Sequence, residues 1–246
     1  MIEPKVILED DSLLVLDKPS GMIVNKSDTT KGERTVQDWV EEYLVIPNLF
    51  RDPKSEVDFY NRAGIVHRLD KETSGILLVA KTPEAFVNLQ AQFKERKVQK
   101  TYLTLVHGKL DSNEGEINVS VGRLPWNRRR FGVVPGGRES TTKYKVLSIK
   151  YLVSEKEKEP LTLLELTPKT GRTHQIRVHL QYIHHPIFSD PLYAGRKTSR
   201  NDRKILPRVF LHAAKISFFH PRTSEWISLE CSLPNDLNSF LQALNP

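Results

Sequence analysis

The sequence predicts an α+β fold in which a mixed, largely antiparallel β-sheet is flanked by helices and loops. Pairs of short apolar segments are separated by turn residues, as in Val6–Asp17, and such pairs are typical of antiparallel hairpins. Other segments, such as Thr35–Leu44, repeat apolar residues at helical spacing. An unbroken apolar run, Ile76–Ala80, has the length of a strand that is buried on both faces.

The N-terminal third is predicted to contain two strands, a turn, a helix and a loop. In Val6–Asp17 the acidic pair Asp10–Asp11 separates V-I-L-E from S-L-L-V-L-D, and the tight turn K-P-S-G follows. Thr35–Leu44 reads as an amphipathic helix that packs on the sheet. The polar segment Ile46–Ala63 contains two prolines, which predicts an irregular loop.

The remaining elements follow in alternation. Thr82-Pro83-Glu84 offers an N-cap hydroxyl, a proline and an acid at the start of a helix. Lys100–Gly108 has the alternation of a strand. The other expected elements are a hairpin from Lys143–Val153 and Leu161–Leu166, a helix that begins near Thr173, and two closing strands within Val209–Glu230.

Composition narrows the class of protein. The 246 residues can form one large domain or two small ones, and the net charge of +7 favours an anionic partner, with nucleic acid ahead of a membrane surface. The single cysteine, Cys231, excludes an internal disulfide and a cysteine-based zinc cluster. The N-terminus lacks a signal peptide pattern, and no apolar run approaches the roughly 18 residues of a membrane span. We therefore expect a soluble cytoplasmic protein.

Polar side chains crowd the entrance of the buried run Ile76–Ala80. Burying unpaired charge is costly, so a cluster of this kind beside the deepest strand is more often a site than a scaffold, and Asp70 is its natural centre. The cluster comprises His67, Arg68, Asp70, Lys71, Glu72, Thr73 and Ser74.

A basic segment, Gly122–Arg138, reads G-R-L-P-W-N-R-R-R-F-G-V-V-P-G-G-R. It contains five arginines, two aromatic residues and no acid. Its glycines and prolines argue against regular structure, and basic loops interleaved with aromatic rings suit RNA, which offers phosphates and unstacked bases. The alternative is the solvated tip of a hairpin.

The helix expected near Thr173 carries two faces. Ile176, Leu180 and Ile183 share an apolar face, and His174, Arg177 and Gln181 share the opposite one. The alternative is that the histidines form a metal site. However, His174 and His179 are five residues apart, which is not a spacing that places two side chains on one helix face, and no acid lies between them. We therefore expect no metal.

These motifs resemble those of one family. H-R-L-D-K-E-T-S-G-I-L-L-V-A-K, from His67 to Lys81, resembles the catalytic motif of the RluA-type pseudouridine synthases, H-R-L-D-x-x-T-S-G-L-L-x-x-A-K. The segments D-K-P-S-G, K-T-Y-L-T-L-V-H-G, G-R-T-H-Q-I-R-V-H and L-H-A-A-K-I-S-F-F-H-P follow the family's order. Two departures are Thr104, where the family usually has alanine, and Ser189, where it usually has glycine.

The resemblance implies an RNA pseudouridine synthase that isomerises uridines in rRNA or tRNA without a cofactor. It implies one catalytic domain over residues 1–246 with no separate N-terminal RNA-binding domain, and a central active-site cleft between the Asp70 loop and the Arg177 helix. We expect RNA as the partner, no membrane association and a monomer.

The resemblance also assigns roles to residues. Asp70 is the expected catalytic aspartate, Tyr102 lies against the target base, and Arg177 pairs with Asp70 and keeps it ionised. Arg68 enters the space that a flipped base vacates. RNA contacts are expected from Arg123, Arg128, Arg129, Arg130, Arg172 and His174.

Each of these roles has a structural alternative. Asp70 could cap a turn, Tyr102 could be a core aromatic residue, Arg177 a surface cation and Arg68 a member of an ion pair, while His67 is expected to be a buried hydrogen-bonding residue.

The chemistry is consistent with one prominent carboxylate. Glycosidic bonds are usually attacked with the help of carboxylates, and a hydrolase needs two. In pseudouridine formation the uracil is turned and rejoined, so no water is activated and one aspartate can suffice. The sequence contains no G-x-S-x-G elbow, Walker loop or G-x-G-x-x-G. Two rivals stay open: a non-catalytic RNA-binding module, and a nucleoside or RNA hydrolase that uses the same aspartate with water.

Overall fold

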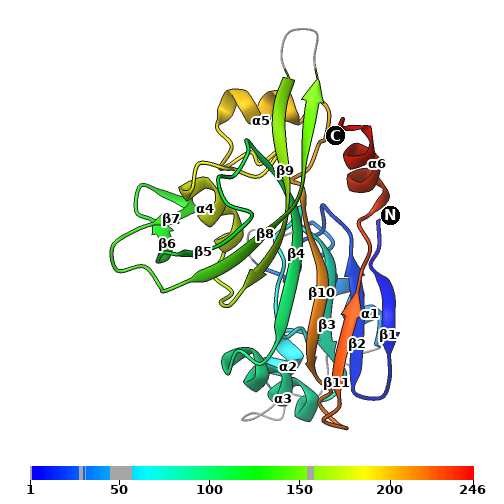
Figure 1. Ribbon diagram of the computed structural model, residues 1–246. Coiled ribbons are helices and arrows are strands. Elements are labelled where there is room, and N and C mark those ends of the chain that lie inside the picture. Colours follow the sequence, from blue (N-terminus) through cyan, green and yellow to red (C-terminus); the bar gives the residue numbers. More distant parts are fainter. Residues whose placement is uncertain (1, 28–29, 31, 45–56, 154–157) are drawn as a thin grey trace. The chain divides into compact units, whose positions relative to one another are not determined.

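The computed structural model describes residues 2–27, 30, 32–44, 57–153 and 158–246, with the side chains of residues 57, 128 and 129 left aside. The chain divides into two compact units (Figure 1). The first comprises Met1–Gln99 and Lys215–Cys231, and the second Lys100–Ala214 and Ser232–Pro246. The expectation of a single catalytic domain stays a prediction.

The first unit is a sheet with three helices. Its strand order is β1-β2-β3-β10, and β11 pairs with β10; the β1–β2, β2–β3 and β10–β11 pairs are antiparallel. The strands are β1 (Lys5–Glu9), β2 (Leu13–Lys18), β3 (Ser74–Ala80), β10 (Leu211–Phe219, from Lys215 on in this unit) and β11 (Trp226–Glu230), and the helices are α1 (Val36–Tyr43), α2 (Val57–Asn61) and α3 (Pro83–Lys94).

The strand β3 is the centre of this unit. Every residue of β3 is buried, which confirms the prediction made from its unbroken apolar run. Leu13 and Val15 of β2, Ile76 and Leu78 of β3, and Phe86 of α3 belong to one apolar core. The helix α3 begins as predicted, because the Thr82 side chain accepts a hydrogen bond from the Ala85 amide and Pro83 follows it.

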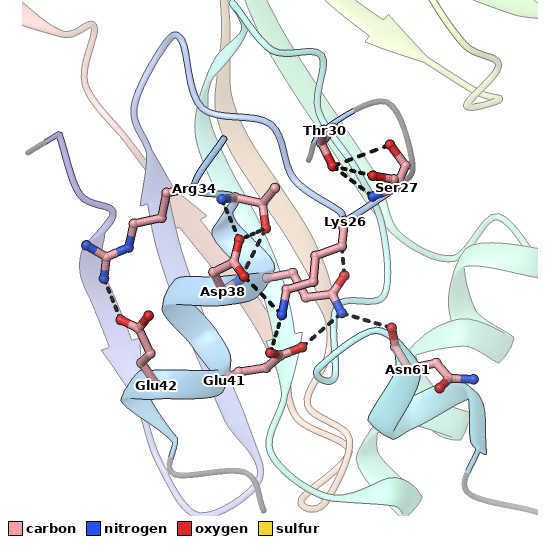
Figure 2. Close-up of polar contacts among 10 residues, drawn as sticks. Lys26, Ser27, Thr30, Arg34, Asp38, Glu41, Glu42 and Asn61 are labelled. Atoms are coloured by element: carbon pink, nitrogen blue, oxygen red, sulfur yellow. Dashed lines mark hydrogen bonds and ion pairs between the residues drawn. The ribbon is translucent and has the colours of Figure 1, made fainter. Parts of the chain in front are cut away.

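The helix α1 is fixed to the preceding loop by charge pairs. Thr35 and Asp38 form a capping box, which satisfies two amides at the start of the helix. Figure 2 shows the Lys26 ammonium against the carboxylates of Asp38 and Glu41, and Arg34 against Glu42. Burial opposes the charged form of Lys26, but its hydrogen bonds to Glu41 and Asp38 outweigh this and raise its pKa. The predicted amphipathic helix is confirmed.

The loop expected over Ile46–Ala63 is corrected in part. Residues 46–56 lie outside the described part of the chain, but Val57–Asn61 form the short helix α2. The ring of Phe59 packs edge-on against Phe86 of α3, with centroids 5.8 Å apart. A tertiary contact of this kind stabilises a helix too short to show a periodic pattern.

The second unit contains a sheet with the strand order β4-β9-β8-β5 and a separate two-stranded sheet, β6-β7. The β4–β9, β9–β8 and β8–β5 pairs are antiparallel. The strands are β4 (Gln99–His107, from Lys100 on in this unit), β5 (Glu114–Asn118), β6 (Val121–Leu124), β7 (Asn127–Val133), β8 (Thr141–Val153) and β9 (Lys158–Pro168), and the helices are α4 (Gln175–Tyr182), α5 (Arg196–Asp202) and α6 (Asn235–Ala243).

The glycines and prolines of the basic segment Gly122–Arg138 predicted irregular structure, and this prediction is wrong for most of the segment. The segment forms most of the hairpin β6–β7, in which Gly122 faces Gly132 across the pair. A Cβ at Gly122 would lie 2.6 Å from Val134 Cγ2, and one at Gly132 would lie 2.8 Å from Leu124 Cδ2. The two glycines therefore make room for neighbouring side chains in a ladder whose register shifts between Arg123 and Leu124, and the hairpin backbone of the alternative is correct.

The two helices α5 and α6 were not expected from the sequence. The residues of α5, R-K-T-S-R-N-D, have no apolar periodicity, and its anchor is Asp202, which caps the Ser189 amide at 3.1 Å. In α6 only Leu237 is buried. None of the helices in the described ranges is long and apolar enough to cross a membrane.

Candidate active site

The Asp70 segment lies in the first unit, in the turn that leads into β3. Asp70 is half-buried, Arg68 is exposed and Leu69 between them is buried. The Asp70 carbonyl accepts a hydrogen bond from the Thr73 amide at 3.1 Å. His67 Nε2 accepts one from the Leu78 amide at 2.9 Å. This confirms the hydrogen bond expected of His67, but the residue is half-buried and not buried as predicted.

The turn from Lys18 to Met22 holds the chain that follows Asp70. The Lys18 side chain is fully buried, and its Nζ donates to the carbonyls of Pro19 and Met22 at 2.8 Å and of Lys71 at 3.1 Å. The Gly21 amide also donates to the Lys71 carbonyl, at 2.8 Å. Ser20 Oγ donates to the carbonyl of the next residue, Glu72. The backbone of Lys71 and Glu72, the two residues after Asp70, is therefore bound to this turn.

Lys18 is a residue that sequence reasoning missed. A fully buried lysine is rare unless its ammonium is satisfied, and here three carbonyl oxygens match its three N–H donors. The signal that could have found it was the K-P-S-G turn. A lysine that directly precedes a tight turn can reach the carbonyls that the turn directs inward.

Tyr102 lies in the second unit, in β4 opposite Leu166. It is half-buried and packs against the apolar core of that unit. This packing is what the alternative, a core aromatic residue, requires. The catalytic role of Tyr102 therefore stays a prediction.

Arg177 lies on α4 and is not a surface cation, because only 7% of it is exposed. Its Nε donates to Asp190 Oδ2 at 2.7 Å and its Nη2 to Oδ1 at 2.9 Å, a two-bond geometry that fixes the plane of the guanidinium. Asp190 is fully buried and also accepts the amides of Leu192 and Tyr193. The expected pairing of Arg177 with Asp70 stays a prediction.

The departure from the family at Ser189 leaves the backbone in the conformation that glycine favours. Ser189 has a φ of 66°, which costs free energy for a residue other than glycine. Its hydroxyl donates to the Leu206 carbonyl, and its amide donates to Asp202. These bonds hold the turn that carries Asp190.

The start of α4 is anchored by Gln175, which is buried. Its Oε1 accepts from Thr170 Oγ1 at 2.7 Å and from the Arg172 amide at 3.0 Å, and its Nε2 donates to the Thr141 carbonyl and to Thr142. Arg172 Nε donates to the Glu139 carbonyl at 3.3 Å. His174 is the N-cap residue, with a φ of 56° and no side-chain cap bond.

The hairpin Val121–Arg138, which we call the arm, carries the other expected RNA-binding residues. Arg123 lies over the Phe131 ring at 5.2 Å, and Arg130 lies over the Tyr193 ring at 5.3 Å. Trp126, at the turn of the hairpin, is 79% exposed. Arg128 and Arg129 lie in β7, with their side chains outside the described part.

The second unit thus brings several predicted residues together around one that sequence reasoning missed, Tyr193. Its hydroxyl lies 2.9 Å from His174 Nδ1 and 3.1 Å from the Phe131 amide, and Arg177 lies 5.0 Å from its ring centroid. Figure 1 shows the hairpin β6–β7 beside α4. The signal that could have found Tyr193 was the segment S-D-P-L-Y-A-G, residues 189–195, which begins with the Ser189 departure from the family.

Comparison with known proteins gives concordant relatives. The family described as RNA pseudouridylate synthase matches residues 12–182. The chain is 40% identical over 244 residues to a ribosomal large subunit pseudouridine synthase D of Nitrosomonas europaea, covering 98% of this chain and 65% of that one. It is 37% identical over 244 residues to a synthase C of Vibrio parahaemolyticus, covering 99% and 70%. The chain spans less than two thirds of the length of the synthase D relative.

Solved structures show the same architecture. Human RNA pseudouridylate synthase domain containing 1 is 25% identical with a TM-score of 0.72, over 99% of this chain and 89% of that one. The human domain-containing 4 protein has a TM-score of 0.69 at 21% identity, over 96% and 91%, and shows the fold alone. The predicted fold class is therefore confirmed. With a family match over 12–182 and these relatives, the chain belongs to the RNA pseudouridylate synthase family.

Proposed function

We propose that this chain isomerises specific uridines in RNA to pseudouridine, with Asp70 as the catalytic carboxylate. The observation that carries the proposal is that this chain, a member of the family, has the H-R-L-D segment with a half-buried Asp70. The turn that contains Asp70 is held by the Lys18 ammonium, which binds the Lys71 carbonyl. A fixed carboxylate is what a reaction at a sugar carbon needs, because the rate depends on near-attack geometry.

The reaction rearranges one nucleoside without gaining or losing atoms. The bond from the sugar C1′ to uracil N1 breaks, a bond from C1′ to uracil C5 forms, and the proton on C5 is replaced by one on N1. Asp70 serves either as the nucleophile, at the sugar or at the base ring, or as the base that removes a sugar proton. Tyr102 lies against the base and takes the C5 proton, and no cofactor takes part.

Arg177 pairs with Asp70 in this proposal and keeps the carboxylate ionised. A guanidinium that is already oriented in a plane is a better partner than a mobile one, because less entropy is lost when the pair forms. The buried pair of Arg177 with Asp190 supports this role. Arg68, which is exposed, fills the space that the flipped uridine leaves.

The substrate is proposed to be large-subunit ribosomal RNA, with transfer RNA as the alternative. The names of the relatives from Nitrosomonas europaea and Vibrio parahaemolyticus state the large ribosomal subunit. The arm, together with Arg172 and His174, supplies contacts to phosphates and unstacked bases. The proposed setting is the cytoplasm, and the proposed active form is a monomer.

The test compares the purified wild-type chain with Asp70→Asn on an unmodified large-subunit ribosomal RNA transcript. We expect the wild type to form pseudouridine at defined positions, mapped by carbodiimide labelling, in a product of unchanged mass. Asp70→Asn should lose at least about 1,000-fold in rate, because the carboxylate takes part in the chemical step. Asp111→Asn, at an exposed aspartate, is the matched control and should keep the wild-type rate.

The rivals predict other results. Release of free uracil would identify a hydrolase. Tight RNA binding without pseudouridine in either ribosomal or transfer RNA, and with Asp70→Ala equal to the wild type in every assay, would identify a non-catalytic binding module.

A further inference from the structure

Tyr193 is bound to three parts of the second unit at once. It belongs to the turn that carries Asp190, whose Oδ1 accepts the Tyr193 amide at 3.1 Å. Its hydroxyl accepts a hydrogen bond from the Phe131 amide of the arm at 3.1 Å and lies 2.9 Å from Nδ1 of His174. Only 4% of Tyr193 is exposed, and its partners Phe131 and His174 are half-buried.

The ring of Tyr193 also lies against two arginines. The guanidinium of Arg130, from the arm, is 5.3 Å from the ring centroid, and that of Arg177 is 5.0 Å from it. Both distances are within the range of a cation–π contact. Val121 of the arm and Val178 of α4 form a small apolar cluster with the same ring.

We propose that Tyr193 is a positioning residue that couples the arm to the Arg177 guanidinium, so that RNA bound to the arm changes the surroundings of an Arg177 that Asp190 already orients. The inference rests on the proposed function for its catalytic readout. The hydroxyl holds the arm through the Phe131 amide, and the ring supports Arg177 directly. The same turn supports Arg177 a second time, because Asp190 binds both the Tyr193 amide and the guanidinium.

The protonation state of the phenol suits this role. A backbone amide can only donate, so the Phe131 amide uses a lone pair of the Tyr193 oxygen. In the bond with His174 Nδ1 the proton belongs to the phenol or to the ring, according to the histidine tautomer. Burial raises the pKa of Tyr193, so the hydroxyl keeps its proton at neutral pH. The acceptor of the Phe131 amide therefore stays a neutral hydroxyl at neutral pH.

Two variants separate the hydroxyl from the ring. Tyr193→Phe removes both hydroxyl bonds and keeps the ring, so we expect faster hydrogen exchange at the Phe131 amide and a KM for the ribosomal transcript raised about fivefold, with kcat within about twofold of the wild type. Tyr193→Leu also removes the ring beside Arg177, so kcat should fall by about tenfold or more.

The control variant is Phe210→Leu, which removes another buried ring of this unit. This variant should lower the melting temperature and leave KM, kcat and hydrogen exchange at the Phe131 amide unchanged, because Phe210 has only a structural role. The proposal is wrong if Tyr193→Phe leaves both KM and Phe131 exchange unchanged, or if Tyr193→Leu lowers kcat no more than Phe210→Leu does.

A readout independent of catalysis keeps this inference separate from the proposed function. In the wild type, adding the ribosomal RNA transcript should shift the NMR resonance of the Arg177 Nε–H, and in Tyr193→Leu this response should be lost. If the wild type binds the transcript and forms no pseudouridine, the proposed function is wrong. The response of the Arg177 Nε–H resonance to RNA still tests whether Tyr193 couples the arm to Arg177. An Arg177 resonance that does not respond to bound RNA in the wild type overturns the coupling.

Discussion

Lys18 shows how one buried side chain can determine the shape of a site at some distance along the sequence. Its ammonium donates to three carbonyls, and one of them belongs to Lys71, the residue after Asp70. The charged group is fully buried, so without these acceptors its desolvation would be costly. The backbone next to Asp70 is therefore fixed by the ammonium of Lys18.

Replacing Lys18 with methionine is expected to destabilise the protein. Lys18→Met keeps the buried chain but leaves its carbonyl acceptors without the ammonium, so we predict a loss on the order of 3 kcal/mol in the free energy of unfolding, measured by urea titration. Lys94→Met, at an exposed lysine of α3, is the matched control and should stay within about 0.5 kcal/mol of the wild type. Equal stability of the two variants would contradict the role given to Lys18.

His107 provides a pH-dependent contribution to stability in the second unit. It is 9% exposed, with Nδ1 2.7 Å from Glu159 and Nε2 3.1 Å from Asp202. Burial disfavours the charged ring, but the hydrogen bonds to Asp202 and Glu159 outweigh burial and raise the pKa of His107 from 6.5 to about 9. The folded state therefore binds a proton that the unfolded state releases at neutral pH.

The sign of the pH effect follows from this raised pKa. The His107 contribution is fully present below pH 6.5 and is lost as pH rises through about 9. A shift of this size corresponds to an order of magnitude of about 3 kcal/mol. His107→Gln should thus be less stable than the wild type at pH 6, with the gap closing by about pH 9, as followed by urea unfolding at each pH. A gap that stays constant across this range would rule out a charged His107.

At the scale of elements, the arm has two sides with different tasks. Phe131 and Arg130 face Tyr193 and dock the arm on α4, whereas Trp126 is exposed at the turn. A tryptophan in solvent has no packing role, and a base can stack on its ring. The two aromatic residues of the basic segment, which look alike in the sequence, are therefore assigned different functions.

Trp126→Ala is predicted to weaken RNA binding without affecting the fold. Loss of one stacked base should cost about 1–3 kcal/mol of binding free energy, measured by fluorescence anisotropy with the ribosomal transcript. Trp226, 45% exposed on β11, provides the control, because Trp226→Ala removes an exposed ring outside the arm. If both variants bind RNA as the wild type does, the arm does not contribute stacking.

Local patterns predicted the elements whose cores are built from neighbouring residues. The strands β2 and β3, the amphipathic helix α1 and the cap of α3 were expected from apolar spacing and cap residues, and the structure confirms them. The hairpin of the arm was only the alternative interpretation, and α5 was not expected at all. In the arm a cross-strand glycine pair makes room for neighbouring side chains, and in α5 an aspartate binds the amide of the distant Ser189.

At the scale of the whole molecule, the net charge of +7 is expected to dominate the proposed binding of RNA. Contacts between cations and phosphates release counterions, so binding should weaken steeply with salt. We predict that KM for the ribosomal transcript rises with potassium chloride concentration, while kcat at saturating RNA does not change.

The double variant Arg128→Ala, Arg129→Ala tests how much of the salt dependence of RNA binding comes from the arm. Each lost phosphate contact should reduce the salt slope of log K by about 0.7 on single-stranded RNA. Arg130 is kept in this variant because its guanidinium lies over Tyr193. A slope equal to that of the wild type would remove these two arginines from the RNA interface.

The sequence by itself determined the family and the fold class and predicts the role of Asp70, because these depend on contiguous motifs and on apolar spacing along single elements. Only the tertiary structure revealed that Lys18 holds the chain after Asp70, that Asp190 holds Arg177, and that Tyr193 joins the arm to α4. The physical reason is that burial of a polar group requires a specific partner, and that partner is chosen by the folded chain and not by its neighbours in sequence.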